Sequence, residues 1–437
     1  MENTPKIAFA IFLLCALVIE DVESIGVNYG TLGNNLLQPA QVAQFLKDNT
    51  IIDRVKIFDA KPEVIKAFAD TGILVAITIP NGEIPALTKL DYATEYITKN
   101  VKPFYPSTKI NYICIGNEVL HWGPQNLIDN LVAAMTTLDQ ALNSVGIKDV
   151  KVTSPQSLAI LEPLLNTAPP SLAHFRAGWD KGVIAPMLQY HRDTKSPFMV
   201  NPYPYFGFTK DVEDFAVFRR NDTVTFDAAT KKSYSNMFDL LLDSVYISMK
   251  KLGFQDVGIV VGETGWPSLC GPLEPHCSVT NAASYNGGLL KKANSGEGTP
   301  LMPNRKFEIY TFGLFNENEK PGPEAERNFG LFWPDFTEVY KIGIVKAGPL
   351  KNDYLNAHVD APAPAPATGN ATVNAPAGKT DQLEVQKKPV QGTHSNNTST
   401  STKKEQQNDG GASSSSGNLS PLLALNVVLP ILMFLYK

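Results

Sequence analysis

The chain has 437 residues, of which 43% are hydrophobic and 19% charged, a composition typical of a globular protein and too apolar for a chain that is disordered throughout. The 38 basic and 43 acidic residues give a net charge of -5, which leaves no basic excess for binding nucleic-acid phosphates. Four cysteines and six histidines, with no Cys-x-x-Cys pair, argue against a disulfide-dense scaffold and a zinc module. We therefore expect a protein that works without nucleic acid, metal or cofactor.

The N-terminal segment predicts secretion. Residues 7–19 form an apolar run that follows Lys6 and is shorter than the roughly 20 residues that a membrane-spanning helix needs. Val22 and Ser24 suit a cleavage site. We interpret residues 1–24 as a signal peptide, and the alternative is a buried first strand.

The C-terminal segment has the composition of a lipid-attachment signal. An apolar run at 422–436 follows a run of mostly small residues at 408–418. Small residues, a polar spacer and a short apolar tail together direct attachment of a glycosylphosphatidylinositol (GPI) anchor. We expect attachment between Asn408 and Ser416, removal of residues 412–437, and a protein at the outer face of the plasma membrane or in the cell wall. A membrane-spanning tail is the alternative.

A stalk is predicted ahead of this signal, because residues 356–411 contain Pro-Ala repeats and then mainly polar residues, without any aromatic side chain. Such a segment cannot bury enough apolar surface to offset its chain entropy. The potential N-glycosylation sites, which share the N-x-[ST] pattern, are Asn370, Asn396 and Asn397 in the stalk and Asn221 in the main domain.

Eight apolar, strand-like runs divide residues 25–355, and helix-period segments lie between most of them. Strands that alternate with helices favour a parallel sheet buried on both faces. Eight such units predict a single catalytic domain with the α/β architecture of a (β/α)8 TIM barrel. An open doubly wound sheet is the alternative, although it would usually bring a glycine-rich phosphate turn, which this sequence lacks. The expected strands are 24–30, 54–59, 73–79, 110–119, 151–157, 198–206, 257–266 and 307–317, and the two clearest helices are 126–146 and 235–253.

Two glutamates lie close behind glycines at the ends of expected strands. Glu118 ends the fourth strand after Gly116, and Glu263 follows Gly262 in the seventh. The C-terminal ends of barrel strands surround the active site. Hydrolysis of a glycosidic bond needs one protonated carboxyl group to donate a proton and one carboxylate to act as base or nucleophile. We therefore predict that Glu118 and Glu263 are a catalytic pair.

Amides and aromatic rings gather at the same strand ends. We expect the amides to bind sugar hydroxyls and the rings to stack on the apolar faces of sugars. For any single ring, the alternative is a place in the barrel core. The expected substrate-binding residues are Tyr29, Asn117, Asn201, Tyr203, Trp266 and Phe315.

Five segments carry longer patterns: VGETGWPS (261–268), IGVNYG (25–30), IGNEV (115–119), NPYPYF (201–206) and LFNENEKPGPEAERNFGLF (314–332). Together they resemble the plant endo-1,3-β-glucanases of glycoside hydrolase family 17. The resemblance implies a retaining mechanism with Glu263 as nucleophile and Glu118 as proton donor. It also implies that Glu317, Lys320 and Glu326 line or support the cleft.

The resemblance implies endo-hydrolysis of 1,3-β-glucans of the callose or laminarin type, and we expect the enzyme to act as a monomer. Two alternatives stay open: transglycosylation through the same covalent intermediate, and non-catalytic glucan binding on the same barrel. Retention of both glutamates favours an enzyme. Many membrane-bound relatives carry a cysteine-rich carbohydrate-binding module after the barrel, and this sequence departs from them because no cysteine follows Cys277.

The cysteines allow one short disulfide. Cys270 and Cys277 enclose a loop that an oxidising compartment can close, although their spacing alone does not decide whether they are bridged. Cys114 lies inside an expected strand, so we expect a buried thiol there.

Phosphatidylinositol-specific phospholipase C is expected to release the protein from intact membranes, because that enzyme cleaves the lipid of a GPI anchor. Release is measured by immunoblotting of the supernatant. Protein that stays with the membrane and still carries its sequence up to Lys437 would contradict the anchor.

Overall fold

The computed structural model describes residues 24–356, apart from 166, 273 and 275. The predicted signal peptide up to residue 23, almost all of the stalk and the GPI-attachment region lie outside the described residues, as do the three stalk glycosylation sites. Among the described residues, every helix is too short or too polar to cross a membrane. Asn221, the remaining glycosylation site, is exposed.

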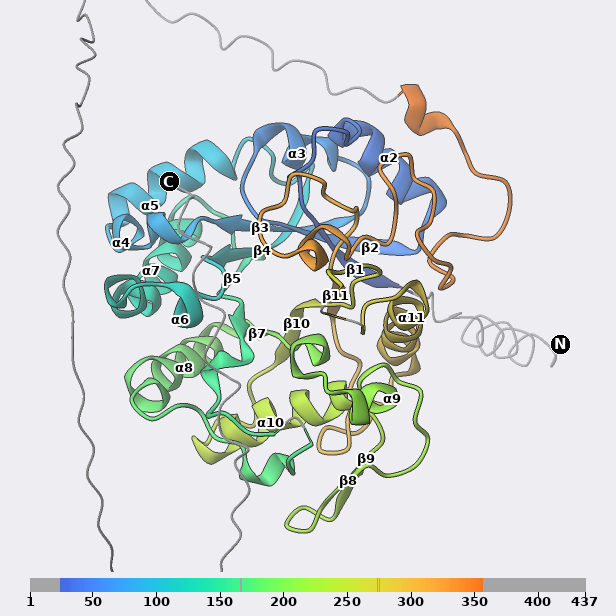
Figure 1. Ribbon diagram of the computed structural model, residues 1–437. Helices are drawn as coiled ribbons and strands as arrows, with labels where there is room; N and C mark the ends of the chain where they lie inside the picture. Colours follow the sequence, from blue (N-terminus) through green and yellow to red (C-terminus); the bar gives the residue numbers. More distant parts are fainter. Residues whose placement is uncertain (1–23, 166, 273, 275, 357–437) are drawn as a thin grey trace, which may run out of the picture. The chain divides into compact units, whose positions relative to one another are not determined.

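A parallel sheet forms the centre of the fold, and helices surround it (Figure 1). All eight predicted strand regions contain strands of this sheet, in the spatial order β5-β4-β3-β2-β1-β11-β10-β7-β6. The strands are β1 (Ile25–Tyr29), β2 (Ile52–Ile57), β3 (Leu74–Ile79), β4 (Lys109–Ile115), β5 (Lys151–Thr153), β6 (Gln156–Ser157), β7 (Phe198–Asn201), β10 (Ile259–Thr264) and β11 (Ile309–Thr311).

The sheet closes on itself at a two-residue bend. β5 and β6 are the two edges of the sheet, yet only Ser154 and Pro155 separate them in the chain. β5 pairs with β4 and β6 pairs with β7, so the bend joins the edges. Pro155 has no N–H to donate, which explains why the expected strand 151–157 is interrupted there. The fold is therefore a (β/α)8 barrel, as predicted, and the open doubly wound alternative is wrong.

Alternate residues of each strand pack on opposite sides of the sheet. On β3, Val75 and Ile77 belong to the large outer layer beneath the helices, whereas Ala76 lies in a small separate cluster. That cluster also contains Cys114 and Met199, whose sulfur atoms are 3.9 Å apart, so it fills the barrel interior. The predicted buried thiol of Cys114 is confirmed.

The outer layer consists of helices that cover the sheet (Figure 1). Both clearly predicted helices are present, as α7 (Gln125–Ser144) and α10 (Met237–Lys251). The helices are α2 (Pro39–Asn49), α3 (Pro62–Ala67), α4 (Ile84–Leu87), α5 (Leu90–Asn100), α6 (Val119–Trp122), α7 (Gln125–Ser144), α8 (Ala185–Thr194), α9 (Glu213–Ala216), α10 (Met237–Lys251) and α11 (Val279–Ser295).

Helix α10 is buried more completely than its apolar periodicity predicts. Gly253, with φ 84°, turns the chain just beyond its end, as expected. Its polar residues Asp243 and Ser248 are buried as well as its apolar ones. Asp243 accepts hydrogen bonds from the Tyr234 hydroxyl at 2.9 Å and the Leu301 N–H at 2.8 Å. The segments that contain Tyr234 and Leu301 therefore pack against α10.

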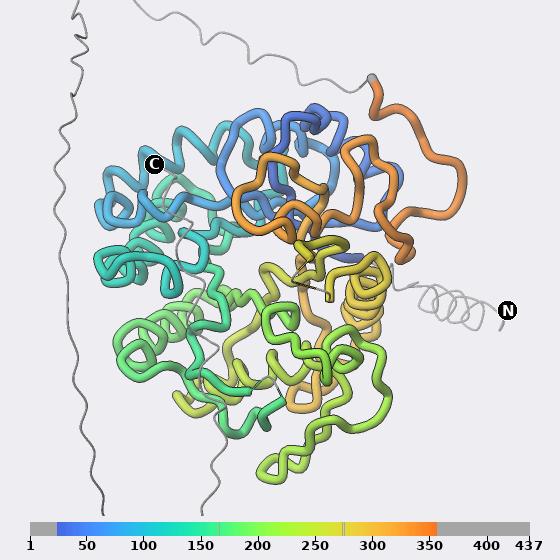
Figure 2. Tube along the Cα trace, viewed as in Figure 1, coloured from blue at the N-terminus to red at the C-terminus, as the bar shows by residue number. Residues whose placement is uncertain are grey.

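The end of the described chain returns to its beginning. The Ile51 N–H donates to the Ile344 carbonyl at 3.0 Å, and the rings of Phe45 and Phe336 stack with centroids 4.0 Å apart. Figure 2 shows the orange C-terminal stretch beside the blue segment that contains α2. A further short hairpin, β8 (Thr225–Asp227) with β9 (Lys232–Tyr234), projects from the loop between β7 and α10.

Candidate active site

Glu118 lies in the turn between β4 and α6, at the C-terminal end of the barrel. Gly116 has φ 64° and Glu118 itself has φ 52°, a left-handed conformation that is unfavourable for a residue with a side chain. The Glu118 N–H donates to the Pro155 carbonyl at 2.9 Å. The bend that closes the barrel therefore also fixes the backbone of this glutamate.

Two neutral donors hold the Glu118 carboxyl group. The side-chain amide of Asn201 donates to Oε1 at 2.9 Å, and the indole N–H of Trp122 donates to Oε2 at 3.1 Å. Burial, and then the nearby charge of Glu263, raises the pKa of Glu118 to about 7. His121 lies 4.0 Å from Oε2, but burial lowers its pKa, so it stays neutral near pH 7. Glu118 can therefore carry a proton at neutral pH.

Glu263 has a different environment on β10, where it is 6% exposed. The Lys56 ammonium group lies 2.9 Å from Oε1, and the Tyr203 hydroxyl donates to Oε2 at 3.2 Å. Burial raises the pKa of Tyr203 well above its ordinary value, so this hydroxyl remains a donor. A fully buried cation thus balances the carboxylate charge of Glu263.

The chain that follows β7 links the two glutamates. Asn201 binds Glu118 and Tyr203, two residues later, binds Glu263. A Cβ atom on Gly262 would come within 2.8 Å of the Met199 sulfur, so glycine permits the close approach of β7 and β10. The structure brings together four predicted site residues, Glu118, Glu263, Asn201 and Tyr203, at the end of the barrel where they were expected.

Asn117 contributes its backbone to the turn and leaves its side-chain oxygen available. Its N–H donates to Asn81 Oδ1 at 2.7 Å. The Oδ1 atoms of Asn117 and Asn201 are buried and have no hydrogen-bond partner among the described residues. Since buried polar atoms normally have partners, these two oxygens are suited to accept hydrogen bonds from substrate hydroxyls.

Lys320 and Glu326 support the site from the loop after β11. Lys320 Nζ lies 3.0 Å from Glu326 Oε2 and 4.0 Å from the centroid of the Phe312 ring. Phe312 in turn contacts Tyr203 edge-on, with centroids 6.2 Å apart, and Phe58 at 6.1 Å. Lys56 Nζ stands 4.2 Å from the Phe58 centroid. Two lysines therefore pack on one pair of aromatic rings beside Glu263.

Glu317 holds the loop that follows β1. Its Oε1 accepts from the Leu32 N–H at 2.7 Å, and burial raises its pKa. A Cβ atom on Gly30 would lie 2.3 Å from Glu317 Oε2, so only glycine leaves room for the carboxyl group. This arrangement gives Glu317 a supporting position near the cleft.

Three rings predicted to bind sugar lie in the core instead. Tyr29, Trp266 and Phe315 are 2%, 0% and 3% exposed, so their faces are not available for stacking. Tyr29 and Phe315 contact each other with centroids 6.2 Å apart, and the Trp266 indole donates to the His276 carbonyl at 3.1 Å. Side chains alternate between the two faces of a strand, so Tyr29 lies on the same face as Val27. Both therefore belong to the outer layer, which explains why Tyr29 is buried.

Sequence reasoning missed Lys56 and Trp122. Lys56 lies between the apolar residues Val55 and Ile57 of β2, and a buried lysine requires a partner, so this position was a usable signal. Trp122 follows Glu118 by four residues, the spacing at which side chains meet on a helix. Trp122 is nevertheless 53% exposed.

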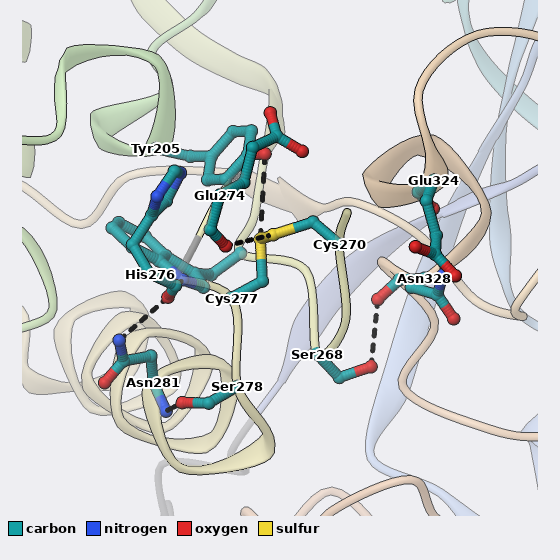
Figure 3. Close-up of a disulfide and its surroundings, with 11 residues drawn as sticks. Tyr205, Ser268, Cys270, Glu274, His276, Cys277, Ser278, Asn281, Glu324 and Asn328 are labelled. Atoms are coloured by element: carbon teal, nitrogen blue, oxygen red, sulfur yellow. Dashed lines mark hydrogen bonds between the residues drawn. A yellow bond between two sulfur atoms is a disulfide. The ribbon is translucent and has the colours of Figure 1, made fainter. Parts of the chain in front are cut away.

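The Cys270–Cys277 disulfide is present, with Cα atoms 5.6 Å apart. Figure 3 shows the bridged loop next to Tyr205 and above the start of α11. The Asn281 side chain donates to the His276 carbonyl at 2.8 Å, and the Asn281 N–H donates to Ser278 Oγ at 3.0 Å. The loop therefore covers Trp266, which explains the burial of that ring.

Comparison with known proteins agrees with this geometry. The model of glycosyl hydrolases family 17 matches residues 25–344, which include both glutamates. The chain belongs to glycosyl hydrolase family 17. It is accordingly a glycosidase, and the (β/α)8 barrel is the fold of its structural neighbours.

Named relatives match about three quarters of the chain. A wheat (Triticum aestivum) glucan endo-1,3-beta-glucosidase is 49% identical over 74% of this chain and 70% of its own length. Arabidopsis thaliana glucan endo-1,3-beta-glucosidase 7 is 41% identical over 74% of this chain and 64% of its own length. The structure of CJP38, a beta-1,3-glucanase and allergen of Cryptomeria japonica pollen, is 36% identical, with a TM-score of 0.68 over 73% of this chain and 98% of that chain.

The pH dependence of this glycosidase is expected to follow Glu118. Since the acid must be protonated, kcat/KM should fall about tenfold per pH unit above the pKa of about 7. Asn201→Ala removes a hydrogen bond that favours the carboxylate, so it should move this alkaline limb to higher pH. Rates measured across pH with the purified variants test this. The exposed Asn143→Ala on α7 is the control, and a shift to lower pH in Asn201→Ala would contradict the assignment.

Proposed function

We propose that this glycosidase hydrolyses internal 1,3-β-glucosidic bonds of glucans with retention of configuration, with Glu263 as nucleophile and Glu118 as acid and base. The observation that carries the proposal is the unequal setting of two neighbouring glutamates. Glu263 lies 2.9 Å from a lysine, whereas Glu118 has only neutral donors within hydrogen-bonding distance and a raised pKa. Glycoside hydrolysis requires this difference, because one carboxyl group must be ionised and the other must carry a proton.

The first half-reaction forms a glycosyl ester. The Glu263 carboxylate attacks the anomeric carbon while Glu118 donates its proton to the glycosidic oxygen, and the bond between that carbon and oxygen breaks. Negative charge leaves Glu263 and appears on Glu118. Asn201 and Trp122 then stabilise the Glu118 carboxylate through the hydrogen bonds that they already donate.

The second half-reaction returns both groups to their starting states. Once Glu263 is esterified, its charge no longer raises the pKa of Glu118, so Glu118 becomes a base. It takes a proton from a water molecule whose oxygen attacks the anomeric carbon, and Glu263 leaves as a carboxylate beside Lys56. Attack from opposite faces in the two steps restores the original configuration.

The relatives support the choice of substrate. The wheat, Arabidopsis and Cryptomeria proteins are named as β-1,3-glucanases or glucan endo-1,3-beta-glucosidases. A further solved neighbour, 33% identical with a TM-score of 0.65, is described among plant beta-glucan endohydrolases. The predicted signal peptide and GPI signal support action on glucans outside the plasma membrane or in the cell wall.

Replacement of Glu263 tests the catalytic pair. Glu263→Gln keeps the shape of the side chain but removes the nucleophilic charge, so kcat on laminarin should fall by at least about 10³-fold while glucan binding persists. Turnover and binding are measured on the purified protein by reducing-sugar assay and calorimetry. Glu95→Gln, at an exposed position on α5, should retain full activity. Near-normal turnover by the Glu263→Gln variant would show that Glu263 is not the nucleophile.

The product profile tests the mode of attack. Internal cleavage should give mixed oligosaccharides from laminarin, and kcat/KM should rise from the trisaccharide to about the hexasaccharide because remote sugars contribute binding to the transition state. Proton NMR should show the β-anomer as the first product of a retaining enzyme. Single glucose released from one chain end would contradict endo action, and an α-anomer formed first would contradict retention. Longer products at high substrate concentration would instead indicate transglycosylation.

A further inference from the structure

We infer that the exposed indole of Trp122 is the binding platform for the leaving glucosyl unit, the sugar on the Glu118 side of the bond that is cut. This inference rests on the proposed roles of Glu118 and Glu263. It assigns a sugar-binding surface to short helix α6, which none of the sequence patterns indicated.

The position of the ring is fixed relative to the acid. Trp122 is the last residue of α6, and its indole N–H donates to Glu118 Oε2 at 3.1 Å. The His121 ring stacks against Trp122 with centroids 3.9 Å apart and an angle of 26° between the planes. Hydrogen bonding at 3.1 Å between His121 Nδ1 and Ser157 Oγ anchors this pair to β6. The platform is thus preorganised and would lose little side-chain freedom on binding.

No structural role explains why the Trp122 ring is exposed. Trp122 is 53% exposed although its edge and one face are engaged. A large aromatic surface next to a catalytic carboxyl group is suited to the C–H face of a pyranose, which is apolar and flat. Three of the four rings predicted to do this work, Tyr29, Trp266 and Phe315, are by contrast at most 3% exposed.

The contacts of the two glutamates place this surface on the leaving-group side. Glu118 protonates the glycosidic oxygen, which stays with the leaving sugar after cleavage. Trp122 contacts Glu118, whereas the partners of Glu263 are Lys56 on β2 and Tyr203 after β7. A sugar on the indole therefore lies next to the carboxyl group that donates the proton and away from the Lys56 side of the nucleophile.

The same geometry gives the bound sugar a second effect. The indole N–H hydrogen bond favours the charged form of Glu118, which develops as the proton leaves. A sugar that covers the ring excludes water from this hydrogen bond and so strengthens it at that moment. Trp122 therefore couples binding of the leaving unit to proton transfer.

The test compares two leaving groups in Trp122→Ala. Cleavage of a laminarin-type hexasaccharide releases a sugar as the leaving group, and that sugar can stack on the indole. Cleavage of β-laminaribiosyl fluoride releases fluoride, a single ion that cannot stack. We expect kcat/KM for the hexasaccharide to fall about 10- to 100-fold further than kcat/KM for the fluoride. Equal losses on both substrates, or no loss on the hexasaccharide, would overturn the inference.

The Trp122→Phe variant keeps an aromatic ring but removes the indole N–H group, so it separates the effect of stacking from that of the hydrogen bond. It should recover most of the hexasaccharide rate, while the alkaline limb of the pH profile moves to higher pH because one hydrogen bond to the carboxylate is lost. Loss of rate in Trp122→Phe equal to that in Trp122→Ala would exclude stacking as the cause. This conservative variant also provides the measurement if Trp122→Ala does not fold.

Phe226→Ala is the matched control. Phe226 is 54% exposed, like Trp122, but lies on the projecting β8–β9 hairpin, so its loss should leave the ratio of the two rates unchanged. Failure of the proposed catalytic pair would appear separately, as fluoride turnover that persists in Glu263→Gln. Selective loss in Trp122→Ala together with inactive Glu263→Gln supports both assignments.

Discussion

The contact between Lys56 and Glu263 is the interaction on which the rest of the site depends. Both groups are almost completely buried, and a carboxylate in such a place is costly unless a cation balances it. The barrel supplies one lysine for two glutamates, so the second carboxyl group is left with neutral donors and a raised pKa. The different roles of the two glutamates follow from this unequal supply of charge, with Phe58 and Phe312 keeping water away from the ammonium groups.

A second constraint is the closure of the sheet. Glu263, the proposed nucleophile, lies on strand β10, but Glu118, the proposed acid, lies in a turn whose backbone is unfavourable for glutamate. Its N–H bonds to the carbonyl of Pro155, in the bend that joins β5 and β6, and Trp122 stacks on a histidine that is fixed to β6 through Ser157. The elements that complete the barrel therefore also orient the acid.

Much of this arrangement could be predicted from the sequence. Apolar runs that alternate with helical periodicity were sufficient to predict the strands and the barrel. Glycines followed by glutamates at strand ends were sufficient to place Glu118 and Glu263 at the same end of the barrel. Rings were harder to place, because a shift of one residue at the end of a strand moves a side chain from the cleft to the core. Tyr29 was misplaced for that reason, whereas Trp266 was misplaced because the Cys270–Cys277 loop covers it. Lys56 was overlooked because its partner lies 207 residues away.

The bend at Ser154 and Pro155 has a consequence for how the enzyme responds to heat. β6 contributes two residue pairs to the sheet, whereas β3 and β4 share six. Local opening occurs first where ladders are short, and the acid is bonded to that part of the barrel. We therefore expect warming to loosen this bend before the longer β3–β4 ladder, and so to move Glu118 away from Glu263 while much of the sheet is still intact.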